Sequence, residues 1–192
     1  MSRAIRTFVA VETSEVVRRR AGELAALLRA AGAEVKWVEP HNLHFTLVFL
    51  GDVAEGRVPD VCRAVEQCAA AGAPFALEVR GAGAFPNSAR PRTIWLGVGQ
   101  GAPEMVALHD RIERALEPLG FRPEGRMFEP HLTIGRVKRP TPALERLAPL
   151  LETRADFEAG QIRVDEVVVF ASQLRPSGPI YQPLARAAFK GP

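Results

Sequence analysis

Cysteine, lysine and long apolar runs are all scarce in this 192-residue chain, and each scarcity excludes a class of protein. The two cysteines, Cys62 and Cys68, lie six residues apart without Cys-x-x-Cys spacing, so the sequence predicts neither a disulfide framework nor a soft metal cluster. We interpret both as reduced packing residues. No apolar run approaches the roughly 20 residues of a membrane span, and the first residues lack the layout of a secretion signal. We therefore expect a cytoplasmic protein with no membrane contact.

Lysine is rare even though the chain is mildly basic, with 25 lysine and arginine residues and a net charge of +3. The lysines, Lys36, Lys138 and Lys190, form no Walker-type Gly-Lys-Ser/Thr sequence and no lysine motif for nucleotidyl transfer. This absence argues against an ATP-dependent ligase. The charge is compatible with a polyanionic partner without requiring one, and the guanidinium fork of arginine suits phosphate oxygens.

The chain has no linker or low-complexity segment, and strand and helix patterns alternate along its whole length. We predict strands at 5–12, 35–38, 44–50, 75–79, 93–98, 131–137, 162–172 and 180–189, and helices at 15–31 (capped by Ser14), 58–71, 103–119 and 142–151. Several neighbouring strands lack a helix between them, so they are expected to pair antiparallel. The predicted fold is α+β: one bilobal unit over residues 1–192, in which two similar halves with mainly antiparallel sheets face a central cleft.

One tetrapeptide pattern occurs twice, as His44-Phe45-Thr46-Leu47 and as His131-Leu132-Thr133-Ile134, each inside a predicted strand. Side chains two residues apart on a strand share a face, so each copy presents an imidazole and a hydroxyl together. Histidine has an ordinary pKa of about 6.5, so one copy can accept a proton while the other donates one near neutral pH. If each half supplies one wall of the cleft, the two histidines form an acid/base pair.

The chain resembles the two-histidine phosphoesterases of the RNA 2',3'-cyclic phosphodiesterase and 2'-5' RNA ligase family. The resemblance runs in order through nearly the whole sequence: Arg6-Thr7-Phe8-Val9-Ala10, Trp37-Val38, Asn42-Leu43 before the first motif, Phe49-Leu50-Gly51, Phe85-Pro86, Trp95-Leu96-Gly97, Phe128-Glu129-Pro130 before the second motif, Gly135-Arg136 and Gly178-Pro179-Ile180-Tyr181. It implies a bilobal fold, RNA ends bearing a 2',3'-cyclic phosphate as substrate, tRNA fragments among them, and neither metal nor cofactor. Reversible 2'-5' ligation is also implied. A monomer is the default expectation.

By the same resemblance, His44 donates the proton to the leaving 3'-oxygen and His131 accepts the proton of the attacking water, leaving a 2'-phosphate. From the residues alone the two histidines are equivalent. Thr46, Thr133 and Arg136 are expected to donate hydrogen bonds to the phosphate oxygens. Arg136 lies five residues after His131, so a regular strand turns it to the opposite face unless a bulge or strand end intervenes.

Three alternatives compete with this interpretation. His41, His44 and Asp52 are conceivable metal ligands, although their spacing suits no helix. The segment 97–102 matches the Gly-x-Gly-x-x-Ala pattern of nucleotide-cofactor folds, with a proline following at the helix start. The third alternative is a catalytically idle RNA-binding module that uses exposed arginines, which leaves the paired histidines unexplained.

Four further aromatic or histidine residues carry weaker predictions. His41 follows Glu-Pro, as His131 does, but it lacks a threonine two positions later and is predicted to lie in a loop. His109 is assigned to a solvated or packing face of its helix. Phe8 and Tyr181 are predicted to pack in the protein interior instead of stacking on a base.

Overall fold

A computed structural model describes residues 3–123, 125, 127–176 and 178–191. The elements follow in the order β1 (Ala4–Glu12), α1 (Glu15–Arg29), β2 (Val35–Trp37), η1 (Pro40–Asn42), β3 (His44–Ala54), η2 (Glu55–Arg57), α2 (Val58–Ala70), β4 (Phe75–Phe85), β5 (Thr93–Val98), α3 (Ala102–Leu116), η3 (Glu117–Leu119), β6 (Leu132–Val137), α4 (Leu144–Glu152), β7 (Glu158–Val164), β8 (Glu166–Arg175) and β9 (Gly178–Ala188).

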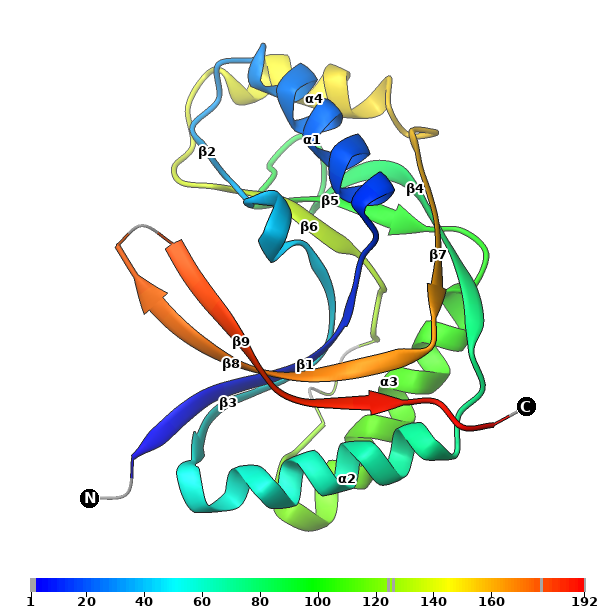
Figure 1. Cartoon of the computed structure of the whole chain (residues 1–192). Coiled ribbons are helices and arrows are strands. Elements are labelled where there is room, and N and C mark those ends of the chain that lie inside the picture. The colour runs from blue at the N-terminus through cyan, green and yellow to red at the C-terminus, as the bar shows by residue number, and fades with distance from the viewer. Residues whose placement is uncertain (1–2, 124, 126, 177, 192) are drawn as a thin grey trace.

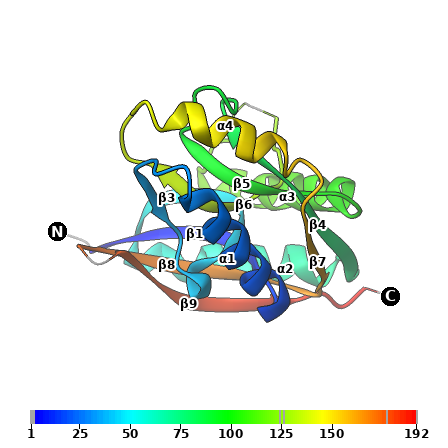
Figure 2. The same cartoon turned by 90° about the horizontal axis from the view of Figure 1, so that it is seen from above.

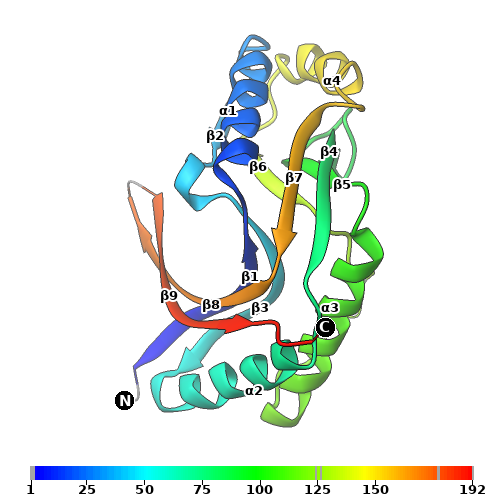
Figure 3. The same cartoon turned by 45° about the vertical axis from the view of Figure 1, so that its right-hand side comes forward.

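The strands form two antiparallel sheets, which confirms the predicted α+β class. The first sheet has the order β3-β1-β8-β9 and the second the order β2-β6-β5-β4-β7. The first sheet is strongly curved, with α2 and α3 packed on its outer side, while α1 and α4 pack on the second sheet (Figures 1 and 2). The motif strands β3 and β6 come from different sheets and contact one another where the sheets meet. The remaining faces of the two sheets therefore turn toward each other around this junction (Figure 3).

In each motif, the residue between the histidine and the threonine and the residue after the threonine anchor the strand in the core. Phe45 and Leu132 are completely buried, and Leu47 and Ile134 are nearly so. Burying side chains of this size stabilises the fold by about 1.5–3 kcal/mol each, which fixes the register of the two strands. The alternation predicted from the sequence thus turns the histidines and threonines away from the core.

Predicted strand boundaries are wrong at β4 and across β7 and β8. Residues 81–85, which lie outside the predicted strands, continue β4, because Gly81 adopts a φ of 78° at an irregularity and lets the strand resume pairing with β5. Residues 162–172, expected to be one strand, belong to β7 and β8 in different sheets. The chain changes sheets at Asp165, so the run of β-branched residues hides a sheet boundary.

No helix within the described residues is both long and apolar enough to cross a membrane.

Candidate active site where the two sheets meet

Both motif histidines are held by the same local hydrogen bond. His44 begins β3 and its Nδ1 lies 2.7 Å from the carbonyl oxygen of Asn42, while His131 directly precedes β6 and its Nδ1 lies 2.8 Å from the carbonyl oxygen of Glu129. A carbonyl oxygen only accepts, so in each ring Nδ1 carries the hydrogen and donates it. In both halves Nε2 is thus the nitrogen that accepts or gives up the proton during titration.

Aromatic rings flank both imidazoles. The His44 ring lies 4.9 Å from Phe8 and 5.1 Å from Tyr181, which meets it edge-on. The His131 ring lies 4.9 Å from Phe85, also edge-on. These contacts restrict ring rotation and exclude water from one side of each histidine. Phe8 is buried and packs in a small cluster with Phe170, which agrees with the packing role predicted for it.

Thr46 and Thr133 lie two residues beyond their histidines, and both are half-buried. Thr46 is opposite Ala10 of β1, and Thr133 is opposite Trp95 of β5. Each threonine falls on the side of its strand away from the buried Phe45 or Leu132, the side that carries the histidine.

A bulge in β6 answers the geometric question raised by Arg136. Trp95 pairs with Thr133 and Ile94 pairs with Gly135, so Ile134 is an extra residue without a partner on β5. One extra residue reverses the alternation beyond it and returns Arg136 to the face that carries His131. After burial, the charge of Arg136 contributes to the lowered pKa of His44, across the junction, and it opposes the burial that raises the pKa of Tyr181.

Burial dominates the electrostatics of His44. Loss of hydration lowers its pKa below the ordinary value, and Arg136 lowers it further, while the hydrogen bond to Asn42 and the carboxylate of Glu12 raise it. The neutral imidazole is therefore favoured in the ligand-free protein. An anionic group bound near Nε2 acts in the opposite direction and favours the protonated ring.

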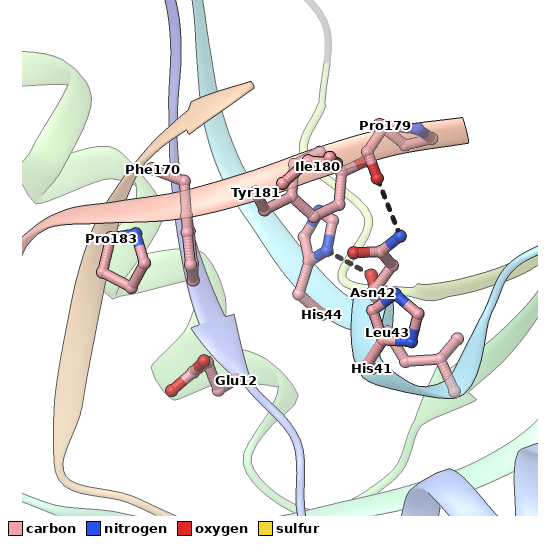
Figure 4. A pocket seen from close by; sticks show the side chains of 10 residues that line it. All are labelled: Glu12, His41, Asn42, Leu43, His44, Phe170, Pro179, Ile180, Tyr181 and Pro183. Atoms are coloured by element: carbon pink, nitrogen blue, oxygen red, sulfur yellow. Dashed lines mark hydrogen bonds between the residues drawn. The ribbon is translucent and has the colours of Figure 1, made fainter. Parts of the chain in front are cut away.

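Sequence reasoning missed two residues beside His44, namely Asn42 and Glu12. They line a small pocket together with residues of η1, β8 and β9 (Figure 4). The Asn42 amide donates to the carbonyl oxygen of Pro179 at 3.0 Å, so it ties the turn before His44 to β9. Glu12 is directly opposite His44 in the register of β1 and β3. The signal available in the sequence was the position of Asn42, two residues before the histidine.

The conceivable metal ligands are not brought together. Asp52 lies eight residues beyond His44 on β3, a separation of roughly 25 Å along an extended strand. His41 is exposed on η1. Among the described residues no group of three or more histidine, cysteine, aspartate or glutamate side chains is arranged to hold a metal ion.

The segment 97–102 is not a dinucleotide-binding turn. The preceding strand β5 is antiparallel to both of its neighbours, unlike the parallel strands of a nucleotide-cofactor fold. The Glu78 carboxylate accepts from the Gln100 N–H at 3.2 Å, and it occupies the space beside Gly99. The loop thus binds an anionic side chain of its own protein where such a fold would bind a phosphate.

His109 is a buried structural residue. Its Nδ1 lies 2.9 Å from the carbonyl oxygen of Leu47, its Nε2 lies 3.4 Å from the Glu113 carboxylate, and its ring stacks on Phe128 at 4.1 Å. Of the two faces predicted for it, the packing face is correct. It holds α3 against the back of the first motif strand.

Comparison with known proteins identifies the family. The model of the 2'-5' RNA ligase superfamily matches residues 9–174. The chain is 42% identical over 178 residues to an RNA 2',3'-cyclic phosphodiesterase of Methanothermobacter thermautotrophicus, covering 92% of this chain and 95% of the relative. A relative of the same name from Thermotoga maritima is 35% identical over 192 residues, covering 97% of each. The protein therefore belongs to the 2'-5' RNA ligase superfamily, as the resemblance in its sequence predicted.

Solved structures agree on the fold. A protein of Thermus thermophilus superposes with a TM-score of 0.82 at 30% identity, covering 97% of this chain and 99% of that one. E. coli LigT in its apo form superposes with a TM-score of 0.78 at 24% identity, covering 99% and 100%. The predicted two-histidine phosphoesterase fold is thus confirmed.

Proposed function

We propose that this protein opens RNA 2',3'-cyclic phosphate ends to 2'-phosphomonoesters by paired-histidine acid/base catalysis that needs no metal ion. The observation that carries the proposal is the matched pair of histidines. Each donates a hydrogen bond from its Nδ1–H to the carbonyl oxygen two residues before it. His44 begins a strand of the first sheet, His131 directly precedes a strand of the second, and the charge of Arg136 in the second sheet acts on His44. The names and near-complete coverage of the relatives support the substrate class.

The reaction needs two proton transfers on opposite sides of phosphorus. His131 accepts a proton from water as the water oxygen attacks phosphorus. The bond from phosphorus to the ribose 3'-oxygen breaks, and His44 donates its Nε2 proton to that oxygen. The product is a 3'-hydroxyl beside a 2'-phosphate, and a proton transfer through solvent restores both rings. The same displacement with the 5'-hydroxyl of a second RNA in place of water gives 2'-5' ligation.

Charge on the non-bridging oxygens grows during attack, and donors fixed in advance stabilise it most. Arg136 supplies a permanent cation for these oxygens. Its guanidinium is oriented by a hydrogen bond that Nη1 donates to the Thr93 hydroxyl oxygen at 3.3 Å. The hydroxyls of Thr46 and Thr133 supply one donor from each strand.

Because the pKa of His44 is lowered in the free protein, His44 can act as the acid only once bound substrate favours its protonated form. The free protein favours the neutral ring, and the negative charge of the cyclic phosphate beside Nε2 compensates for its burial and for Arg136. Substrate binding thereby recruits the proton that the leaving oxygen needs. The bound phosphate thus favours the charged ring that the free protein disfavours.

The experiment is hydrolysis of a short RNA that ends in a 2',3'-cyclic phosphate, in excess chelator, with the product monoester identified by phosphorus NMR. We expect a 2'-phosphate from the wild type and a loss of at least about a hundredfold in kcat for His44→Ala and for His131→Ala. His41→Ala, at the pocket beside His44 but without a motif threonine, is the matched histidine comparison and is expected to lose far less turnover than either motif variant.

Each other outcome has a definite meaning. A 3'-phosphate product reverses the roles of the two histidines. Activity abolished by chelator contradicts metal independence. RNA affinity that persists without any turnover by the wild type would instead favour a catalytically idle binding module. The proposal extends to tRNA fragments as natural substrates, which turnover of a tRNA half tests. It also extends to a monomeric enzyme, which light scattering tests.

A further inference from the structure

The two motif strands share a second device, beyond the repeated histidine and threonine. In β3, Ala10 pairs with Thr46 and Val9 pairs with Val48, so Leu47 is an extra residue without a partner on β1. The extra residue of β6, Ile134, likewise follows the motif threonine directly. Each bulge therefore reverses the alternation at the same point of its motif.

The bulge in β6 delivers Arg136 to the histidine face, five residues after His131, and the bulge in β3 delivers Phe49, five residues after His44. Phe49 stacks on Phe8 at 5.7 Å with the ring planes within 9° of parallel, and Phe8 in turn contacts His44. A regular strand would turn Phe49 to the buried side with Phe45. The two positions are thus equivalent in the two halves, one carrying a cation and the other an aromatic ring.

Phe49 is unusually exposed for a phenyl ring in the interior of a strand, at 43%. The Arg6 guanidinium carbon lies 5.0 Å from its ring centre, and Arg6 is itself exposed. Arg6 and Phe8 lie two residues apart on β1, so the Arg6 side chain is on the side of the sheet that carries Phe8. We call the pair of Arg6 and Phe49 the Arg6–Phe49 platform. It is continuous with the site through Phe8.

We propose that the Arg6–Phe49 platform binds the nucleotide next to the one that carries the cyclic phosphate, so that the enzyme favours RNA chains over single nucleotides. The inference rests on the proposed function. Aromatic rings and guanidinium planes both stack bases without regard to sequence, and an arginine also pairs with a backbone phosphate. The platform lies one ring beyond Phe8, which contacts His44, so it is adjacent to the place where the proposed reaction puts the cyclic phosphate. Because the Arg6 guanidinium lies over the Phe49 ring, the platform offers the next nucleotide the plane and the positive charge of the guanidinium, backed by the ring.

The test compares a two-nucleotide RNA ending in a 2',3'-cyclic phosphate with the corresponding mononucleoside 2',3'-cyclic phosphate. The readout is the ratio of their kcat/KM values, in which any general effect on the histidines cancels. We expect Phe49→Ala to reduce the preference for the dinucleotide about tenfold. Phe49→Leu should reduce it by less, and Phe49→Trp should keep it at the wild-type level. Arg6→Gln is expected to reduce it as well and to weaken its dependence on salt by about one unit of the logarithmic slope.

The control is Phe157→Ala, because the Arg20 guanidinium lies 4.6 Å over the Phe157 ring in a similar pair, formed by α1 and the residue before β7. Its ratio should equal that of the wild type. Calorimetric binding of the dinucleotide product, which needs no turnover, gives a second measurement and should weaken about tenfold in Phe49→Ala. An unchanged ratio and unchanged product binding in Phe49→Ala would overturn the platform, whereas a wild type inactive on both substrates with the binding difference intact would overturn only the proposed reaction.

Discussion

The two motif histidines share one hydrogen-bonding pattern but have different ring neighbours. Both donate Nδ1–H to a carbonyl two residues back, which commits Nε2 to proton exchange. The rings beside His44 are Phe8 and Tyr181, whereas Phe85 meets His131 edge-on. Burial, and after it the charge of Arg136, lowers the pKa of His44. The repeated motif thus gives both side chains the same tautomer, and other elements supply the contacts particular to each.

We expect His44 in the free protein to titrate below its ordinary pKa of about 6.5, because burial and Arg136 both disfavour its charged form. Arg136→Gln should move the midpoint upward, since it removes one cause and leaves the other. Two-dimensional NMR of the imidazole resonances measures both values, and His41→Ala serves to assign the spectrum. A midpoint at or above the ordinary value in the wild type would contradict the burial of this ring.

The same shift makes stability depend on pH. The unfolded chain binds a proton at His44 near pH 6.5, whereas the folded protein binds it only at lower pH. The unfolded state therefore holds more protons in this window, so the contribution of His44 is complete above about pH 6.5 and is lost as pH falls toward the folded pKa. Urea unfolding at about pH 7 and pH 5 should show a smaller difference for His44→Gln than for the wild type.

At the scale of single elements, both motif strands depend on a bulge directly after the threonine. The sequence predicts the strands, since the alternation around each motif is strong. It does not predict the bulges, because an extra residue is defined only against the partner strand. From the sequence, only the family resemblance placed Arg136 beside the phosphate. Phe49 carried part of that resemblance, but no role could be assigned to it. Pairing that joins distant segments supplies the missing information.

β3 also continues through Gly51, where the sequence predicted its end. Gly51 adopts a φ of 68°, which glycine reaches without strain, and the strand then resumes to Ala54. An added Cβ meets no atom within 4 Å, so the cost of a substitution is one of backbone conformation alone.

Gly51→Ala should therefore lower the free energy of unfolding by about 1–2 kcal/mol, measured by urea denaturation. Gly56→Ala is the matched control, because Gly56 also has open space around it but does not have a positive φ. We expect the control to be neutral or slightly stabilising. Equal effects in the two variants would show that backbone strain at residue 51 is not the cause.

At the scale of the whole molecule, the chain passes between the sheets several times. β1 and β3 belong to the first sheet, β2 and β4 through β7 to the second, and β8 and β9 to the first again. The two histidines thus lie on opposite sheets that are connected by repeated crossings of the backbone. Their separation is set by the packing of both sheets together.

The proposed reaction uses both histidines in one displacement, so His44→Ala combined with His131→Ala should be little worse than the more damaging single variant. Single-turnover kinetics of the wild type, the two single variants and the double variant tests this. Effects on kcat that multiply would contradict the two histidines acting as a unit.

The sequence predicted the fold class, the motif strands and most helices, because these depend on local periodicity and caps. Ser14, for example, accepts from the Val17 N–H as the predicted cap of α1. It failed at Asp165, where one β-branched run is divided between two sheets. It also failed at Asn42, whose side-chain amide donates a hydrogen bond to the carbonyl oxygen of Pro179, 137 positions away. Both failures concern contacts that no local pattern encodes.

The order of the strands also determines when the site comes into existence during synthesis. His44 and its threonine leave the ribosome early, but Phe170 and Tyr181, on β8 and β9, are made long after them. β8 is hydrogen-bonded to β1 and separates it from β9, so the first sheet is incomplete until both late strands have been synthesised. A nascent chain therefore carries both motifs well before it can hold His44 in its working environment. Chains terminated before β8 lack the wall around that histidine.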